Sequence, residues 1–111
     1  MTWRVVLRPE VPDDLRALAD FFDEQGQISG RRLVEMMLEA FDDLAAMPGK
    51  GSLKLYRNRR LHDVRSWSVR GLRKILILYR PIENGIEVLA VMHGMRDVRT
   101  HLMRRLQTPP A

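Results

Sequence analysis

The dipeptide Asn84-Gly85, set between two apolar runs, constrains the fold of this chain more than any other feature of its sequence. Both residues tolerate the positive φ that a type I′ turn requires, so the flanking runs are predicted to pair as a β-hairpin. The first run, residues 74–79, is apolar after its first residue, and Pro81 is expected to close it. The second run spans residues 86–92. With residues 64–69 as another strand, the second half is predicted to form a three-stranded antiparallel meander.

The first half of the chain predicts one short strand followed by a helical hairpin. Residues 3–7 are mostly apolar and rich in β-branched side chains, which favours a strand. Apolar side chains then recur at helical spacing from Val11 to Phe22, and again from Leu33 to Met47. Ser29 is placed to cap the start of the second helix.

A short final helix is predicted from Val98, Leu102 and Leu106, which are spaced four residues apart. Asp97 is placed to cap this helix at its start. Residues 107–111 are expected to form a flexible tail, which leaves a single domain over residues 1–106.

These elements give the order β-α-α-β-β-β-α and place the chain in the α+β class. The helical hairpin is expected to pack on one face of a small, mainly antiparallel sheet. The other face is expected to remain partly open, with most of the basic residues on the segments that line it.

Composition excludes several kinds of site. The 111-residue chain has no cysteine, which removes disulfides, thiolate zinc sites and cysteine nucleophiles together. It shows no apolar signal core near its start and no apolar run close to the roughly 20 residues that a membrane span needs. We therefore expect a cytoplasmic protein that does not enter a membrane.

The charge is divided unevenly between the two halves of the chain. Residues 1–48 hold five arginines and ten acids, a balance of −5, whereas residues 49–111 hold fourteen Lys/Arg and four acids, a balance of +10. A basic half of this kind attracts nucleic acid or an acidic protein segment. The alternative is a basic surface that only keeps the protein in solution.

The common catalytic motifs are absent from the sequence, which has no Gly-rich phosphate loop, nucleophile elbow or HExxH. His93, Asp97 and His101 are spaced four apart, but Gly94 interrupts the backbone between them. The three side chains therefore need not share a helix face, and we predict neither a metal site nor a cofactor.

A metal-free ribonuclease is a second possibility, because cations and a histidine on a sheet can supply acid–base groups and stabilise a charged phosphorane. The strand cations are equally well explained as residues that discourage aggregation at a sheet edge. Tyr79 is better explained as a core residue whose hydroxyl is hydrogen-bonded. The candidate catalytic residues are Arg65, Arg73, Lys74, His93 and Arg96.

Residues 73–97 carry a family resemblance. A hydrophobic strand ending in Ile77-Leu78-Tyr79-Arg80 is followed by a turn and by the strand Val88-Leu89-Ala90-Val91-Met92. This second strand runs into His93-Gly94-Met95-Arg96-Asp97 and then into a short helix. Over about residues 3–106 the chain resembles the RelE/ParE superfamily of toxins from bacterial type II toxin–antitoxin systems, and the His-Gly-x-Arg-Asp ending is closer to the ParE branch.

The resemblance implies a toxin that is neutralised by a cognate antitoxin, with the two proteins in a hetero-oligomer. ParE-like members poison DNA gyrase by binding and are not themselves enzymes, whereas RelE-like members cleave mRNA on the ribosome. Many RelE-like members use a tyrosine or histidine near the chain end, and here no tyrosine follows Tyr79. We therefore predict a ParE-like gyrase poison with no catalytic residues. The alternative is a RelE-like, ribosome-dependent mRNA endoribonuclease.

Two binding surfaces are predicted on this basis. Because Val98, Leu102 and Leu106 face the core, the arginines of the last helix are expected to point outward. The predicted target-binding residues are His93, Arg96, Arg99, Arg104 and Arg105. An antitoxin segment that folds on binding is expected to pack along the helical hairpin and the sheet edge. Its predicted contacts are Phe22, Phe41, Arg57, Arg59 and Arg60.

Overall fold

The structure, a computed structural model, describes residues 2–72, 74–94 and 97–107. Its main elements are β1 (Arg4–Leu7), α1 (Val11–Gln25), α2 (Gly30–Ala46), β3 (Arg65–Ser68), β4 (Ile75–Ile82), β5 (Gly85–His93) and α3 (Val98–Gln107). The segment between α2 and β3 contains η1 (Pro48–Lys50), β2 (Ser52–Leu53) and η2 (Arg59–Leu61), of which η1 and η2 are single turns of 3-10 helix. The predicted α+β class and element order are confirmed, and the two-residue strand β2 is an addition.

One five-stranded sheet has the order β1-β5-β4-β3-β2. The predicted meander β3–β4–β5 forms its centre, with antiparallel pairing throughout. β2 extends the sheet at one edge, and β1 pairs in parallel with β5 at the other. The sheet is therefore wider than the meander that the sequence indicated.

The turn between β4 and β5 differs from the predicted type I′ turn. Glu83 and Asn84 are its two residues, and of these only Asn84 has a positive φ, 62°. Gly85 is instead the first residue of β5. A side chain at Gly85 would collide with the carbonyl oxygen of Arg4 in the neighbouring strand β1. The glycine therefore permits the close approach of β1, and the hairpin depends on Asn84.

Pro81 does not close β4, which continues to Ile82. β3 pairs with β4 only as far as Tyr79, so Pro81 lies beyond the end of β3. β4 is an edge strand at this point, and an edge strand accommodates a proline because no partner needs its missing N–H.

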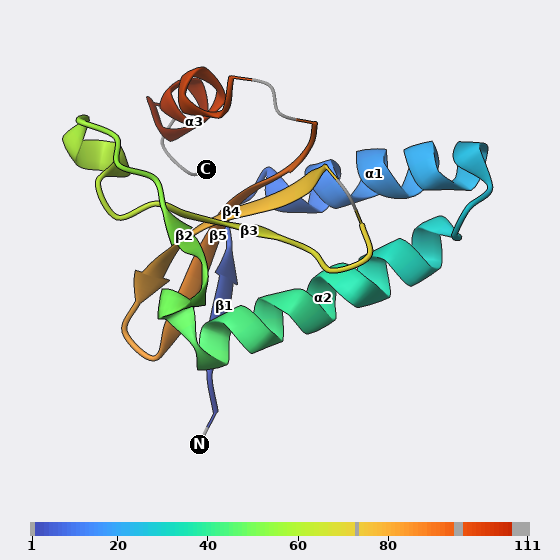
Figure 1. The fold of residues 1–111 in the computed structure, drawn as a ribbon, viewed down its shortest axis with the longest axis horizontal. Coiled ribbons are helices and arrows are strands. Elements are labelled where there is room, and N and C mark those ends of the chain that lie inside the picture. Colours follow the sequence, from blue (N-terminus) through green and yellow to red (C-terminus); the bar gives the residue numbers. More distant parts are fainter. Residues whose placement is uncertain (1, 73, 95–96, 108–111) are drawn as a thin grey trace.

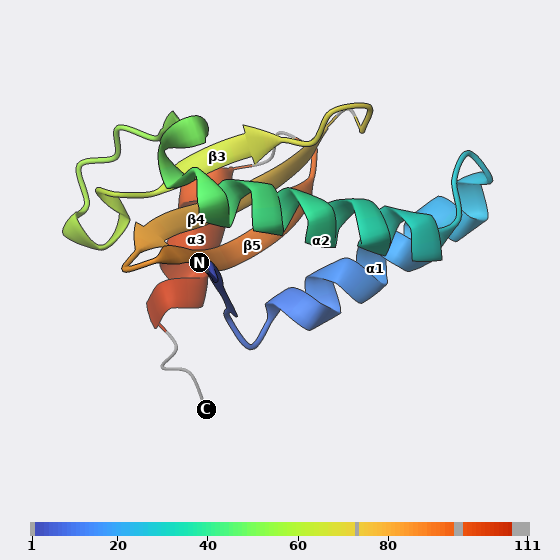
Figure 2. The same cartoon turned by 90° about the horizontal axis from the view of Figure 1, so that it is seen from below.

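Three layers build the molecule: the α1–α2 hairpin, the sheet and α3 (Figures 1 and 2). The hairpin and the sheet enclose one core, in which Leu33, Met37 and Phe41 of α2 are buried together with Ile77 and Val88. Helical spacing places the three α2 side chains on one stripe, which explains why this face of the helix is buried.

A second core lies on the opposite face of the sheet, so the expectation that this face remains partly open is wrong. Leu102 of α3 and Leu61 of η2 pack there against Leu78 and Leu89, and all four are fully buried. The sequence showed α3 as amphipathic but did not show that residues 56–64 would supply the rest of this cover.

A β-bulge allows β5 to contribute to both cores. Cross-strand pairing passes from Leu78–Ala90 to Tyr79–Val88, which leaves Leu89 without a partner. The extra residue changes the alternation of side chains along the strand. Leu89 and Ala90 consequently both face α3, whereas Val88 faces the hairpin.

Both predicted helix caps form. The Ser29 hydroxyl accepts a hydrogen bond from the backbone N–H of Arg32 at 3.0 Å, and the Asp97 carboxylate accepts one from the backbone N–H of Thr100, also at 3.0 Å. Gln107 belongs to α3 and not to the expected tail, and residues 108–111 lie outside the described residues. Among the described residues, no helix is both long and apolar enough to cross a membrane.

Candidate functional site

A largely buried ion pair holds α3 on the rest of the molecule. Arg105 donates hydrogen bonds from both terminal nitrogens to the Asp14 carboxylate of α1, at 2.7 and 2.9 Å. The Arg105 guanidinium also donates to the carbonyl oxygen of Leu89 at 3.0 Å, and Asp14 accepts from the N–H of Val91 at 3.1 Å. Because β1 ends before this part of β5, the ion pair satisfies strand groups that have no neighbouring strand.

This ion pair changes the predicted target-binding set. The Arg105 side chain is only 11% exposed, so the expectation that Arg104 and Arg105 both point outward is wrong for Arg105. Arg104 and Arg99 are exposed on α3, as expected. The hydrogen bonds to Asp14 raise the pKa of Arg105, which keeps this guanidinium charged within the interface.

His93 lies on the other side of the sheet from α3. Its ring is tilted against that of Phe21, with centroids 4.7 Å apart, and lies 6.3 Å from that of Phe22. Together with Gln25 and Leu72, these rings line a hollow of about 420 Å³. His93 therefore does not share a face with Arg99 and Arg104, and Arg96 lies outside the described residues.

Of the three candidate ribonuclease residues that the structure describes, Arg65 lies apart from Lys74 and His93. His93 pairs in register with Ile75 at the start of β4, next to the exposed Lys74. Arg65 is opposite Tyr79, four residues further along β4, which corresponds to about 13 Å. Its guanidinium donates to the carbonyl oxygen of Gly51 at 2.7 Å. Arg73, the remaining member of the set besides Arg96, lies outside the described residues.

Tyr79 has the structural role that the sequence favoured. Its hydroxyl donates to the carbonyl oxygen of Pro48 at 2.7 Å and accepts from the N–H of Gly51 at 2.8 Å. Burial raises the pKa of Tyr79, with the Gly51 hydrogen bond and nearby Arg65 opposing this shift. The tyrosine and Arg65 thus fix the path of the chain between α2 and β3.

Some of the predicted antitoxin-binding residues are buried and the others are exposed. Phe22 and Phe41 are 7% and 1% exposed and belong to the first core, so the expectation that they anchor a partner is wrong. Both lie on the apolar stripes of their helices, and such stripes face the sheet. Arg57, Arg59 and Arg60 are exposed in and before η2.

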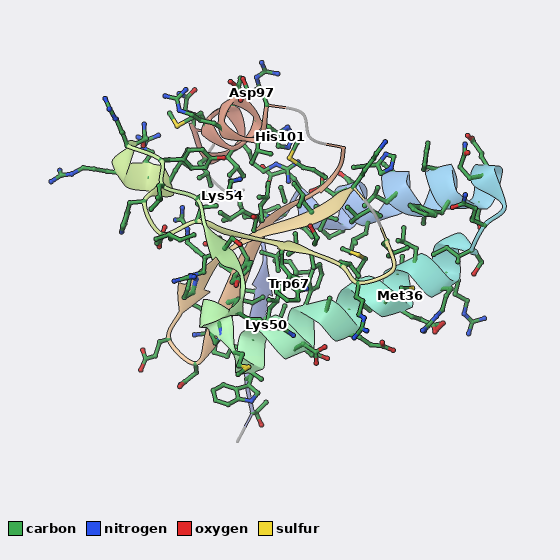
Figure 3. The ribbon with its side chains drawn as sticks, viewed as in Figure 1. Met36, Lys50, Lys54, Trp67, Asp97 and His101 are labelled. Atoms are coloured by element: carbon green, nitrogen blue, oxygen red, sulfur yellow. The ribbon has the colours of Figure 1, made fainter. Side chains whose placement is uncertain are left out.

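A groove that the sequence did not indicate lies between α2 and β3. It has a volume of about 540 Å³ and is lined by apolar and charged side chains, among them Met36, Trp67 and Arg70. The Lys50 ammonium lies 4.6 Å from the centre of the Trp67 ring, a cation–π contact (Figure 3). Among the described strands, β2 covers only Arg65 and Ser66 of β3, so the edge beside Trp67 is unpaired.

Five exposed arginines gather on the side of the molecule formed by η2 and α3. The two elements are joined through the second core, where Leu61 and Leu102 are both buried. Figure 3 shows nitrogen-tipped side chains projecting from both elements into solvent. We define the arginine face as Arg57, Arg59, Arg60, Arg99 and Arg104.

The histidine spacing seen in the sequence does not create a metal site in the described part of the chain. His93 faces the hairpin, whereas the Asp97 carboxylate is hydrogen-bonded to Thr100 at the start of α3. No group of three His, Cys, Asp or Glu side chains among the described residues is suited to hold a metal ion.

Comparisons with known proteins agree with this fold. The family model described as "ParE toxin of type II toxin-antitoxin system, parDE" matches residues 5–98. A solved structure described as "Chromosomal ParDE TA system from P. aeruginosa" superposes with a TM-score of 0.63 at 14% sequence identity, covering 84% of this chain and 97% of that chain. At this identity the match concerns the fold alone. No curated protein matches the sequence.

Proposed function

Because the chain belongs to the ParE family of toxins from type II toxin–antitoxin systems, we propose that it inhibits growth by binding and poisoning DNA gyrase, and that a cognate antitoxin neutralises it. The family model spans residues 5–98, which include the sheet except for Arg4 of β1 and both helices of the hairpin. Toxicity by binding requires an exposed surface and no bond-breaking group.

The arrangement of the basic side chains is the observation that carries this proposal. Arg65 holds the loop after α2, whereas Lys74 and His93 lie at the far end of β4. A ribonuclease needs its acid, base and phosphate-stabilising groups within hydrogen-bond reach of one phosphate. The separation of these three side chains therefore supports binding over RNA cleavage.

A paired assay tests the target. The purified protein is added to gyrase with relaxed plasmid and, separately, to translating ribosomes with a defined mRNA. We expect loss of supercoiling with accumulation of cleaved DNA, and intact mRNA. Cleaved mRNA with unimpaired gyrase would contradict the proposal, and so would normal growth of cells that express the soluble protein.

The antitoxin is proposed to bind in the groove between α2 and β3. The groove combines apolar surface from Met36 and Trp67 with three cations and two acids, namely Arg32, Lys50, Arg70, Glu39 and Asp43. Arg32 pairs with Glu39, so Lys50 and Arg70 are the cations that suit the acidic residues of a segment of alternating apolar and acidic residues. The unpaired edge of β3 offers backbone groups to an extended segment. This position replaces the one that Phe22 and Phe41 were expected to provide.

Charge reversal tests this position. The double variant Lys50→Glu/Arg70→Glu should weaken binding of the protein encoded by the adjacent gene by about tenfold or more. The matched control is Arg16→Glu/Arg31→Glu, which changes the charge equally on the helices of the hairpin and away from the groove. Isothermal titration calorimetry measures both. Equal losses in the two variants would place the antitoxin elsewhere.

A further inference from the structure

Beyond the toxin–antitoxin role, we propose that the arginine face binds the phosphate backbone of double-stranded DNA. This inference concerns the surface formed by η2 and α3 and does not depend on gyrase being the target.

The fold brings the two parts of this surface together from distant parts of the chain. Tyr56, which precedes η2, packs against the second core, and so does Val98 of α3. Burial, with the charge of Asp97, raises the pKa of Tyr56, and the nearby Arg99 opposes this shift. Because η2 and α3 contact each other and both supply residues to the second core, Arg99 of α3 lies on the same side of the sheet as the segment that precedes η2.

Among the described residues, the arginines of the arginine face differ from those of the hairpin in having no ion-pair partner. On the hairpin, Arg16 pairs with Asp13 at 3.0 Å, and Arg31 and Arg32 pair with Glu35 at 3.8 and 3.6 Å. In the described part of the chain, no arginine of the arginine face forms an ion pair with a carboxylate. These five cations are therefore available to a polyanion.

The carboxylates near the arginine face already have other partners. Asp97 accepts hydrogen bonds from the N–H and the hydroxyl of Thr100, at 3.0 and 2.6 Å. Asp63 forms an ion pair with Arg80 at 3.5 Å. The charge of Asp63 is thus balanced by Arg80, whereas Asp97 keeps its negative charge near Arg99. Five arginines against one uncompensated carboxylate leave the surface net positive.

The chemistry of the surface favours a phosphate backbone over an acidic protein. All five cations are guanidinium groups, whose planar forks match phosphate oxygens. A protein interface needs a buried apolar centre as well. The large apolar side chains described as exposed in the segment before η2 are Leu53 and Leu55, at 42% and 86%, and both precede the arginines of η2 in the chain. α3 spans about 15 Å, over which one strand of B-DNA presents about four phosphates.

Salt dependence gives this proposal a quantitative form. Five phosphate contacts predict a slope of about −4.5 for log affinity against log salt concentration. Raising the salt from about 50 to about 200 mM should then weaken binding about 500-fold. Such a loss is much steeper than the loss expected from one or two contacts.

The experiment measures fluorescence anisotropy of a labelled duplex of about 20 base pairs with the purified full chain, at salt concentrations between these limits. For Arg57→Gln/Arg59→Gln/Arg60→Gln the slope should fall to about −1.8, so that the same salt step weakens binding only about 12-fold. For Arg99→Gln/Arg104→Gln the slope should fall to about −2.7.

The matched control is Arg16→Gln/Arg31→Gln/Arg32→Gln, which removes the same charge from the hairpin and should leave the slope unchanged. Thermal melting confirms that each variant is folded. Equal losses in the control and in the η2 variant would overturn the proposal, because net charge alone would then explain binding. Binding of a poly-glutamate peptide without binding of DNA would also overturn it and would assign the surface to an acidic protein. The assay contains no gyrase. A finding that gyrase is not the target of the toxin would therefore not change the DNA-binding result.

Discussion

Arg105 and Asp14 illustrate how two charged side chains can complete a sheet. Arg105 satisfies the Leu89 carbonyl and Asp14 satisfies the Val91 N–H, on the edge of β5 that β1 does not reach. Both side chains are largely buried, at 11% and 15% exposed, so losing one partner leaves a charge with no counterion and strand groups with no hydrogen bond.

We therefore expect Arg105→Met to lower the free energy of unfolding by about 3 kcal/mol. Asp14→Leu should lower it by a similar amount. In the double variant no charge is left without its counterion, so the decrease in the free energy of unfolding should be clearly smaller than the sum of the two single decreases. Urea denaturation measures all three. Strict additivity would show that the pair is not coupled. Arg104→Met, an exposed neighbour, serves as the control.

A second residue-scale prediction concerns pH and His101. Burial and the charges of Arg105 and Arg104 lower the pKa of His101 below its ordinary value of 6.5, while Asp14 and Glu10 oppose this shift. The folded protein therefore binds this proton less readily than the unfolded chain does. The stability of the fold is highest above the unfolded pKa and falls as the pH drops through it.

The free energy of unfolding should thus decrease from about pH 7.5 to about pH 5.5, and His101→Gln should reduce that decrease. Urea titrations at the two pH values provide the measurement. His62→Gln, at an exposed position outside α3, should leave the decrease unchanged. A decrease that persists undiminished in His101→Gln would assign it to another group.

At the scale of elements, α3 depends on its first turn as well as on the ion pair near its last turn. The Asp97 carboxylate accepts from the Thr100 backbone N–H, one of the donors at the helix start that have no partner within the helix. α3 carries two of the five arginines of the arginine face, so fraying of the helix start affects the surface directly.

Asp97→Ala should cost about 1 kcal/mol of helix stability and speed hydrogen exchange in the first turn of α3. Ser29→Ala removes the corresponding cap of α2 and should speed exchange there while leaving α3 unchanged. Exchange measured by mass spectrometry on peptides from each helix distinguishes the two. Faster exchange across both helices after either substitution would indicate global destabilisation instead.

The elements could be predicted from the sequence where their determinants are local. The stripe from Leu33 to Leu44 and the caps Ser29 and Asp97 depend on neighbours within a few residues, and they formed as expected. Met47, predicted as the last residue of the stripe, instead follows the end of α2 at Ala46 and is 64% exposed. Arg104 and Arg105 are adjacent, and only the distant Asp14 determines that one is exposed and the other is buried.

Other parts of the candidate site have the same non-local origin. The sequence indicated Gly85 as a turn residue, but in the structure it allows β1 to approach β5 closely. β1 comes from the start of the chain, so the residues around Gly85 could not reveal this role. The groove at Trp67 is formed by Lys50 and α2 together with β3. The periodicity of apolar residues in the sequence does not predict that these elements lie next to each other. Phe22 and Phe41 were predicted as contacts although their stripes already indicated burial.

At the scale of the whole molecule, the division of charge along the sequence becomes a division in space. Residues 1–48 carry a balance of −5 and include the hairpin, whereas residues 49–111 carry +10 and include η2 and α3. The hairpin and α3 lie on opposite faces of the sheet (Figure 2). Lys50 and Arg70 line the groove beside α2, but the five arginines of the arginine face concentrate positive charge on the α3 side, where like charges repel one another.

Salt should relieve this repulsion. We expect the thermal unfolding midpoint to rise between about 20 and about 300 mM salt, because screening shortens the range of the repulsion. The rise should be smaller in Arg57→Gln/Arg59→Gln/Arg60→Gln and unchanged in Arg16→Gln/Arg31→Gln/Arg32→Gln. Calorimetry at each concentration measures the midpoints. Identical responses in all three proteins would show that the arginine face contributes no net repulsion.

The contact between α1 and α3 also sets an order of events during synthesis. Asp14 and Arg105 are 91 residues apart, so Asp14 leaves the ribosome long before its partner has been translated. The hairpin leaves the ribosome before β4 and β5 do, and α3 docks on α1 only once Arg105 has emerged. Arg104 precedes Arg105 in the same helix, so the arginine face is complete only after α3 has emerged and docked.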